Sequence, residues 1–200
     1  GSWDKVINSV HILKKHGVNI GLKTPILKDN AMDFVAVNKF CNENNFEFSA
    51  SPALFPRTNG DKTPMSYLIE DKQLFDCITN LDKIIPYKKN NINRKDLCFL
   101  NKYSMFIDSY GNVYPCTQFF FKLGDITKSR IRNIWESVEA KRIRNLERDI
   151  KNECCECSLI EYCNFCPGIA YLENNDYNAC THQFKAFAKV RFELYEKEVK

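Results

Sequence analysis

No stretch of this 200-residue sequence approaches the roughly 20 consecutive apolar residues that a membrane-spanning helix needs. The first residues, "GSWDKVINSV", lack the basic start and the apolar core of a signal peptide. Glycine and proline are scarce, with seven of each, whereas hydrophobic residues make up 44% of the sequence and charged residues 27%. This composition is that of a globular protein. We therefore expect a cytoplasmic protein without a membrane partner.

Charge of one sign is not in strong excess either, because 29 basic side chains stand against 25 acidic ones and the net charge is +4. Basic residues gather in the segment 128–148, but Glu136, Glu139 and Glu147 are mixed among them. This mixture favours a solvated helix face over a phosphate-binding stripe. We expect no nucleic-acid partner.

The first half of the chain alternates between two hydrophobic periodicities. A helical period predicts three helices, over residues 3–17, 29–45 and 70–85, and a period of two predicts strands over 18–27 and 46–52. On the first helix, Val6, Val10 and Leu13 form the expected apolar stripe, and Asp29 and Asn30 are candidate caps of the second. This order implies parallel strands joined by right-handed crossovers. Two strands are too few for a stable parallel sheet, which needs both faces covered. Residues 1–96 therefore resemble the end of a larger α/β domain.

The second half is irregular and rich in cysteine. Residues 104–116 predict a β-hairpin, with the turn at 108–112, and Pro167-Gly168 predicts another turn. Helical spacing recurs at residues 126–137, 138–150 and 184–199. We therefore expect residues 97–200 to form a separate, small α+β domain.

Ten cysteines are distributed unevenly. Cys41 and Cys77 fall on apolar helical stripes and are expected to pack in a core. The other eight lie between Cys98 and Cys180, five of them within residues 154–166, "CCECSLIEYCNFC". Disulfides, a zinc site or an iron–sulfur cluster could each use such thiols. Without a secretory signal the thiols stay reduced, which argues for a metal.

The spacing of these cysteines suits two metal sites. After Cys98-x17-Cys116 comes C-x2-C-x5-C-x2-C, and a last cysteine follows after thirteen further residues. A C-x2-C pair on a tight turn lets two thiolates converge on one metal. Zinc takes four ligands in a tetrahedron, and a [4Fe–4S] cube takes one thiolate on each iron. Spacing alone leaves both metals open.

The order of the cysteines resembles a known family. Cys98, the "GNVYPC" unit of Gly111 and Cys116, the segment 154–166 and Cys180 are similar to the seven-cysteine pattern of the SPASM domain, a C-terminal extension of many radical S-adenosylmethionine (SAM) enzymes. The segment "LGDITKSRIRNIWES" fits the same pattern. The first half resembles the closing part of a radical SAM partial (β/α) barrel.

The resemblance implies two auxiliary [4Fe–4S] clusters. Cluster I would take only Cys98, Cys116 and Cys166, because Cys77 lies on a helix and is a poor fourth ligand. Its open iron would bind a substrate thiolate or amide. Cys155 would be a packing or spare thiol. The ligands implied for cluster II are Cys154, Cys157, Cys163 and Cys180.

One departure from the family narrows the implied reaction. Members that resemble sulfatase maturases carry a catalytic aspartate after the hairpin cysteine, where this chain has Thr117. A threonine cannot take up a proton at neutral pH, so formylglycine formation is disfavoured. The resemblance then implies a maturase of a ribosomally made peptide or protein, served by an external electron donor such as a flavodoxin or ferredoxin.

The sequence has no C-x3-C-x2-C motif, through which radical SAM enzymes bind their catalytic cluster. We therefore expect a C-terminal portion of a longer enzyme, inactive alone, with SAM bound only in the full-length protein. No catalytic residue is assigned. The alternatives are a zinc-stabilised binding module without redox chemistry and a stand-alone electron-carrier domain.

Overall fold

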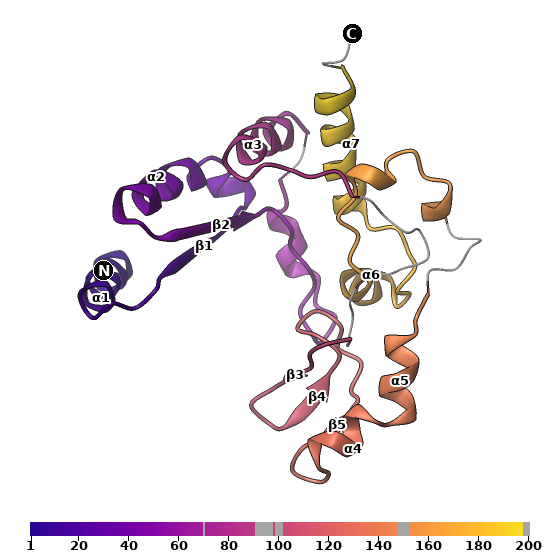
Figure 1. Ribbon diagram of the computed structural model, residues 1–200. Helices are drawn as coiled ribbons and strands as arrows, with labels where there is room; N and C mark the ends of the chain where they lie inside the picture. The colour runs from indigo at the N-terminus through magenta and orange to yellow at the C-terminus, as the bar shows by residue number, and fades with distance from the viewer. Residues whose placement is uncertain (70, 91–97, 99–101, 148–152, 198–200) are drawn as a thin grey trace. The chain divides into compact units, whose positions relative to one another are not determined.

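The computed structural model describes residues 1–69, 71–90, 98, 102–147 and 153–197 (Figure 1). The chain divides into two compact units. Unit 1 comprises Gly1–Ala53 and Tyr67–Tyr87, and unit 2 comprises Leu54–Ser66 and Lys88–Lys200. The expected boundary between residues 96 and 97 falls outside the described residues and stays a prediction.

Unit 1 is a small α/β layer. Its strands β1 (Gly21–Pro25) and β2 (Glu47–Ser51) pair in parallel, with Leu22 opposite Phe48, and the intervening helix forms the crossover (Figure 1). This pairing confirms the parallel arrangement that the alternating periodicity predicts. The remaining elements of unit 1 are α1 (Ser2–Lys15), η1 (Lys28–Asn30), α2 (Phe34–Asn44) and α3 (Asp71–Ile84).

The core of unit 1 lies between its helices and its two strands. Val10, Cys41 and Phe46 are buried together, and Cys77 is completely buried on α3. The predicted packing roles of the two isolated cysteines are therefore confirmed.

Val6, Val10 and Leu13 all lie on helix α1, as predicted, and Val10 is buried while Val6 and Leu13 are exposed. One detail of the sequence prediction is wrong in unit 1. Asp29 and Asn30 do not cap α2, because they form the 3-10 turn η1. There the Asn30 side chain accepts a hydrogen bond from the Leu27 backbone N–H at 2.6 Å and donates one to the Pro25 carbonyl.

Unit 2 combines a small antiparallel sheet with several short helices and the longer C-terminal helix α7. Strands β3 (Phe106–Ile107) and β4 (Asn112–Tyr114) pair across a turn in which Gly111 has a φ of +85°, a conformation that favours glycine. The further strand β5 (Gly124–Asp125), which the sequence did not predict, pairs with β4. The other elements are α4 (Ile131–Trp135), α5 (Val138–Arg144), η3 (Glu153–Cys155), η4 (Ile160–Tyr162), α6 (Pro167–Asn174) and α7 (His182–Lys197), and η2 (Thr63–Tyr67) ends at the division between the units.

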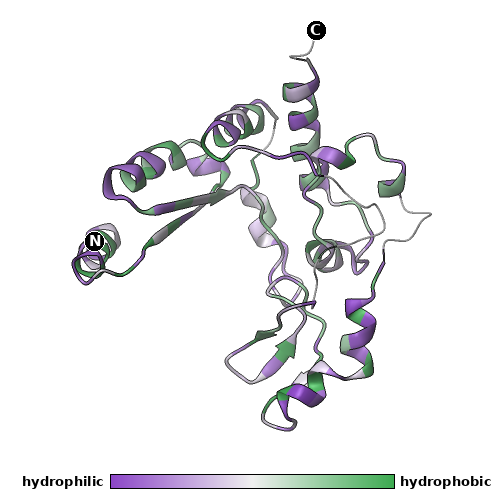
Figure 2. Ribbon diagram, viewed as in Figure 1, coloured by the Kyte–Doolittle hydropathy of each residue, from purple (hydrophilic) through white to green (hydrophobic). Residues whose placement is uncertain are grey.

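The core of the hairpin region is built from the sheet and the two helices that follow it. Val113, Phe119, Ile134 and Ile143 are all buried in one cluster. Ile150, the last predicted apolar position of this region, lies outside the described residues. Figure 2 shows that α5 and α7 each carry both hydrophobic and hydrophilic residues, as helices with one packed face do.

The expected turn at Pro167-Gly168 is wrong, because these residues open helix α6. Pro167 stands in its first turn, where a missing N–H costs no hydrogen bond and the fixed φ of proline suits the helix. Mixed α/β architecture is confirmed for the chain. None of the described helices is long and apolar enough to cross a membrane.

Candidate metal centres

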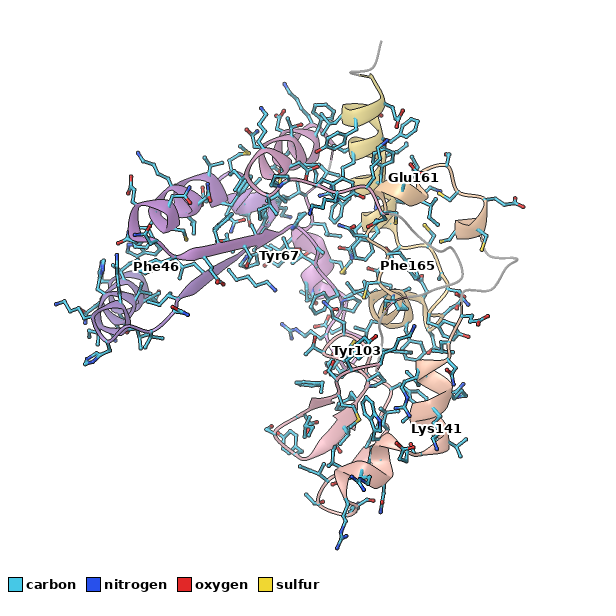
Figure 3. All side chains as sticks on the ribbon, in the orientation of Figure 1. Phe46, Tyr67, Tyr103, Lys141, Glu161 and Phe165 are labelled. Atoms are coloured by element: carbon cyan, nitrogen blue, oxygen red, sulfur yellow. The ribbon has the colours of Figure 1, made fainter. Side chains whose placement is uncertain are left out.

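The four cysteines expected to hold cluster II line one pocket of unit 2. The cavity that they line is small, about 30 Å³, and is partly open to solvent. The pocket is otherwise largely apolar, with Phe165 and Phe184 among its walls (Phe165 is labelled in Figure 3). The cysteines that line it are Cys154, Cys157, Cys163 and Cys180.

The local fold explains how three of these thiols reach one place. A chain of tight turns runs through the segment, because the N–H of Cys157 donates to the carbonyl of Cys154, and the N–H of Ile160 donates to that of Cys157. The N–H of Cys163 then donates to the carbonyl of Ile160 at 3.3 Å. Each turn reverses the backbone within three residues, so that side chains three to six positions apart face a shared space.

A short strap formed by residues 88–90 contacts this segment. The Asn90 backbone N–H donates to the Glu161 carbonyl at 2.8 Å, and the Asn90 side-chain amide donates to the Cys163 carbonyl at 2.9 Å. The Lys89 ammonium pairs with Glu196 of α7 at 2.8 Å and lies over the Tyr162 ring, 4.8 Å from its centroid. The strap thereby fixes the backbone that carries Cys163.

The fourth thiol, Cys180, comes from the residues just before α7. Cys180 as a whole is exposed, but partial burial raises the pKa of its thiol, and the nearby Lys185 ammonium opposes that rise. Cys157 also acts electrostatically on the pKa of Cys180, as expected for thiols that share one pocket. Metal binding at these thiols must release protons.

Thr181, which follows Cys180 and lines the same pocket, is 1% exposed. Its hydroxyl oxygen is buried and has no hydrogen-bond partner in the part of the chain that the structure describes. A buried hydroxyl without a partner costs about 1–3 kcal/mol of stability. The wall of the pocket therefore includes a residue whose buried hydroxyl has no partner among the described protein atoms.

Two of the three thiols expected for cluster I also lie near each other. The backbone N–H of Gln118 donates to Cys116 Sγ at 3.4 Å, and the Cys166 thiol donates to Gln118 Oε1 at 3.8 Å. Gln118 thus bridges the loop after the hairpin and the start of α6.

Cys166 occupies the N-cap of α6. Burial raises the pKa of its thiol, while hydrogen bonds from the backbone N–H groups of Ile169 and Gly168 act in the opposite direction. These N–H groups belong to the first helical turn, where they have no partner within the helix, and they favour a negatively charged sulfur. The position suits a thiolate ligand.

Gly168 allows helix α6 to lie close to the loop that carries Cys116. A Cβ atom placed on it would lie 2.6 Å from the Gln118 carbonyl oxygen and 3.0 Å from the Phe119 nitrogen. Both neighbours are backbone atoms and cannot move as a side chain could. Helix α6 can therefore contact the loop that carries Cys116 only through a glycine.

The structure gives less information on the remaining cysteines and on Thr117. Cys98 is exposed, and the residues on both sides of it lie outside the described part of the chain, so its role as a ligand stays a prediction. Thr117 is exposed, Cys155 is half-buried, and Cys77 is packed in unit 1. Among the described residues, no three His, Cys, Asp or Glu side chains stand in a geometry that could already hold one metal ion.

Sequence reasoning missed Gln118, Thr181 and Asn90 as parts of these sites. A signal existed for Thr181, since a threonine just before a helix is a typical N-cap, but the usual cap would use the hydroxyl within the helix. The contacts of Gln118 and Asn90 join segments 48 and 73 positions apart, which no local pattern reveals.

The chain is similar to several known proteins. Residues 98–167, about a third of the chain, match the family model of SPASM, an iron–sulfur cluster-binding domain. This match agrees with the resemblance that the cysteine pattern predicts, and Cys180 lies beyond the matched range.

A relative among characterised proteins is an AdoMet-dependent heme synthase from Methanosarcina barkeri (strain Fusaro / DSM 804). The two are 32% identical over 72 residues, which is 36% of this chain and 21% of that protein. The chain thus matches about a fifth of the length of this relative.

Solved structures of anSMEcpe share the fold. The native protein with bound AdoMet superposes with a TM-score of 0.62 at 16% identity, covering 98% of this chain and 60% of that one. The native protein with bound AdoMet and the Cp18Cys peptide gives 0.62 at 18% identity, covering 99% and 62%. The chain thus shares its fold with anSMEcpe and part of its sequence with the SPASM model and with the heme synthase.

Proposed function

We propose that unit 2 holds two [4Fe–4S] clusters and forms the auxiliary-cluster part of a radical SAM enzyme that modifies a ribosomally made peptide or protein. The observation that carries the proposal is the pocket that gathers Cys154, Cys157, Cys163 and Cys180. Three of these thiols belong to the matched SPASM segment, and the fold brings the distant Cys180 to them.

The surroundings of the pocket suit a cluster. Four thiols supply one ligand for each iron of a cube. Phe165, Phe184 and Ala188 keep much of the wall apolar, and exclusion of water is one of the factors that set a cluster's potential. When bound, such clusters supply one-electron transfer, or an iron to which a substrate can bind.

For cluster I we propose Cys98, Cys116 and Cys166 as ligands. The positions of Cys116 and Cys166 on either side of Gln118 support this set. With three protein ligands, one iron would be open to a substrate thiolate or amide. The chain's own contribution is to fix the α6 start against the hairpin loop and to offer N–H donors to the Cys166 sulfur.

Unit 1 fits the closing part of a partial (β/α) barrel. Its parallel strands β1 and β2, joined through α2, are one such repeat. The likeness to anSMEcpe with bound AdoMet supports this assignment, and the Cp18Cys peptide in one of those structures supports a peptide partner. We propose further that SAM is bound by residues outside this sequence, in a cytoplasmic enzyme reduced by a flavodoxin or ferredoxin.

Anaerobic purification followed by iron and sulfide analysis tests the proposal. We expect about eight iron and eight sulfide per chain, because each of two cubes holds four of each. Replacement of one cluster II ligand, Cys163→Ala, should remove about half of both, since one of the two cubes is lost. Cys41→Ala, a buried thiol of unit 1, is the matched control and should leave the iron content unchanged.

Zinc gives the contrary outcome. A colourless anaerobic protein that holds tightly bound zinc, and that loses this zinc in Cys163→Ala, would identify a zinc-stabilised binding module and overturn the cluster assignment. A brown protein whose iron content does not respond to Cys163→Ala would place the cluster elsewhere.

A further inference from the structure

Thr181 occupies the N-cap position of α7. The backbone N–H of Lys185 donates to the Thr181 carbonyl at 3.2 Å, which is the first hydrogen bond of that helix. A threonine at this position usually turns its hydroxyl oxygen toward an N–H group of the first turn, which it caps. Here the hydroxyl makes no such bond: it is buried and unpartnered among the described residues.

The position of the Thr181 hydroxyl limits which groups could accept a hydrogen bond from it. Thr181 is 1% exposed, so water does not serve as its partner from the surface. It lines the pocket of the four cluster II thiols and adjoins Cys180 in the chain. The other groups of the pocket wall are mostly carbon, so the pocket offers few protein acceptors for the hydroxyl proton.

The pocket content itself would supply an acceptor. The sulfur atoms of a [4Fe–4S] cluster and of its thiolate ligands accept hydrogen bonds, and such bonds are among the factors that set the reduction potential. A hydrogen bond to sulfur stabilises the more negative, reduced cluster more than the oxidised one. Its donor therefore raises the potential.

We propose that the Thr181 hydroxyl donates a hydrogen bond to a sulfur of the cluster in this pocket and thereby raises its reduction potential. This inference rests on the proposed function, because it needs a cluster on Cys154, Cys157, Cys163 and Cys180. Thr181 is a positioning residue in this scheme: it binds no iron and takes part in no bond that forms or breaks.

The alternative role is simple packing. Thr181→Val keeps the branched shape and removes only the hydroxyl, whereas Thr181→Ser keeps the hydroxyl and removes a methyl group. Packing predicts that both variants behave alike or that serine is worse. A hydrogen bond predicts that valine alone changes the potential.

The test is a redox titration of the anaerobically purified chain, monitored by electron paramagnetic resonance. The signal that Cys163→Ala abolishes is assigned to cluster II. We expect Thr181→Val to shift the midpoint of that signal to a lower potential, and Thr181→Ser to stay at the wild-type value. Thr79→Val, which removes a hydroxyl that donates to Phe75 within α3 of unit 1, should have no effect.

Each outcome decides the question. An unchanged potential in Thr181→Val, or an equal shift in valine and serine variants, overturns the inference. Loss of cluster II iron in the valine variant but not in the serine variant supports a need for the hydroxyl, whereas loss in both overturns it, because serine retains the donor. Failure of the proposed function looks different: the wild-type chain itself would then show no signal that depends on Cys163.

Discussion

At the scale of the residue, Gly168 is the glycine at which an added Cβ would make the shortest contact. Gly168→Ala would place a methyl carbon 2.6 Å from the Gln118 carbonyl oxygen, so the helix and the loop must move apart. Overpacking of this kind typically costs about 1–3 kcal/mol. We expect a lower free energy of unfolding in chemical denaturation, together with loss of iron from cluster I.

A matched glycine serves as the control. In Gly21→Ala the new carbon would meet its nearest neighbour at 3.6 Å, an ordinary contact, so stability and iron content should stay close to the wild-type values. If Gly168→Ala also retained full stability and iron, the close contact between α6 and the loop would not be needed for the site.

The predictability of the site differs from residue to residue. Spacing indicated that Cys154, Cys157 and Cys163 act together, because turns of three residues are local and repeat in sequence. It could not indicate Gln118, whose contact with the Cys166 thiol depends on the pairing of separate segments. Nor could it show that the Thr181 hydroxyl lacks a protein partner, because that depends on packing around α7, as the described residues show it.

At the scale of the element, Gln183 fixes α7 to the segment 54–66. Its side chain pairs with the Leu54 backbone, accepting from the N–H at 3.0 Å and donating to the carbonyl, and also donates to Glu173 at 2.7 Å. Gln183 is 3% exposed. The side-chain amide of Gln183 thus bonds both the N–H and the carbonyl of Leu54, as the backbone of a neighbouring β-strand would.

We expect Gln183→Ala to lower the free energy of unfolding by about 1–3 kcal/mol, because the Leu54 groups and Glu173 would lose buried partners. Limited proteolysis should show faster cleavage within residues 54–66. Gln73→Ala is the matched control, since the exposed Gln73 amide donates to the Lys28 carbonyl near the surface of unit 1. Equal cleavage rates in the wild type and in Gln183→Ala would contradict this role.

The C-terminal helix is also held by an ionic contact that depends on pH. Hydrogen bonds from Lys89 and Tyr162 hold the pKa of the Glu196 carboxyl below its usual range. A carboxyl with a lowered folded-state pKa stabilises the fold above its unfolded pKa, about 4.3, and loses that contribution as the pH falls through the folded value. The strap at residues 88–90 should therefore loosen in acid.

Thermal unfolding at a series of pH values measures this effect. We expect Glu196→Gln to lose stability relative to the wild type at neutral pH and to show a smaller further loss on acidification below about pH 4.3. Exposed Glu139→Gln is the control and should follow the wild-type curve. Parallel curves for Glu196→Gln and the wild type would rule out this contribution.

The elements were easier to predict than their ends. The helix and strand order of unit 1 follows from periodicity alone, and the parallel pairing follows from that order. The predicted ends were wrong where a side chain has a different partner, as Asn30 has in Leu27, or where proline could either end a turn or begin a helix, as at Pro167. Strand β5 is too short for any periodicity to show.

At the scale of the whole molecule, the two units should respond differently to metal removal. None of the cysteines proposed as cluster ligands lies in unit 1, whereas Cys154, Cys157 and Cys163 of unit 2 lie on a chain of short turns. Metal bound to the folded state stabilises it by mass action. Removal of iron should therefore lower hydrogen-exchange protection mainly in unit 2.

Hydrogen exchange followed by mass spectrometry measures the protection of each unit separately. After chelation under anaerobic conditions, we expect faster exchange in peptides covering residues 153–182 and unchanged exchange in α2, β2 and α3. Uniform loss of protection across both units would show that metal supports the entire chain, and no change in either unit would show that the fold of unit 2 is independent of it.

The division of the chain was the least predictable feature at this scale. Composition gives no hint that residues 54–66 belong with unit 2, and the reason lies in tertiary contacts of Leu54 with Gln183 and of Lys62 with the Glu173 carbonyl. Such contacts span more than a hundred positions, whereas periodicity reports only on neighbours.

The glycine at position 168 also limits where the sequence can accept an insertion. Because its backbone meets the backbone at Gln118, the number of residues between Cys166 and that contact is fixed, and one extra residue between them would present a Cβ where none fits. The requirements of this domain therefore include a residue that contributes no side chain. The spacing of the cysteines is determined by the ligands that a site needs. The glycine is required because the backbones of helix α6 and the loop are in contact.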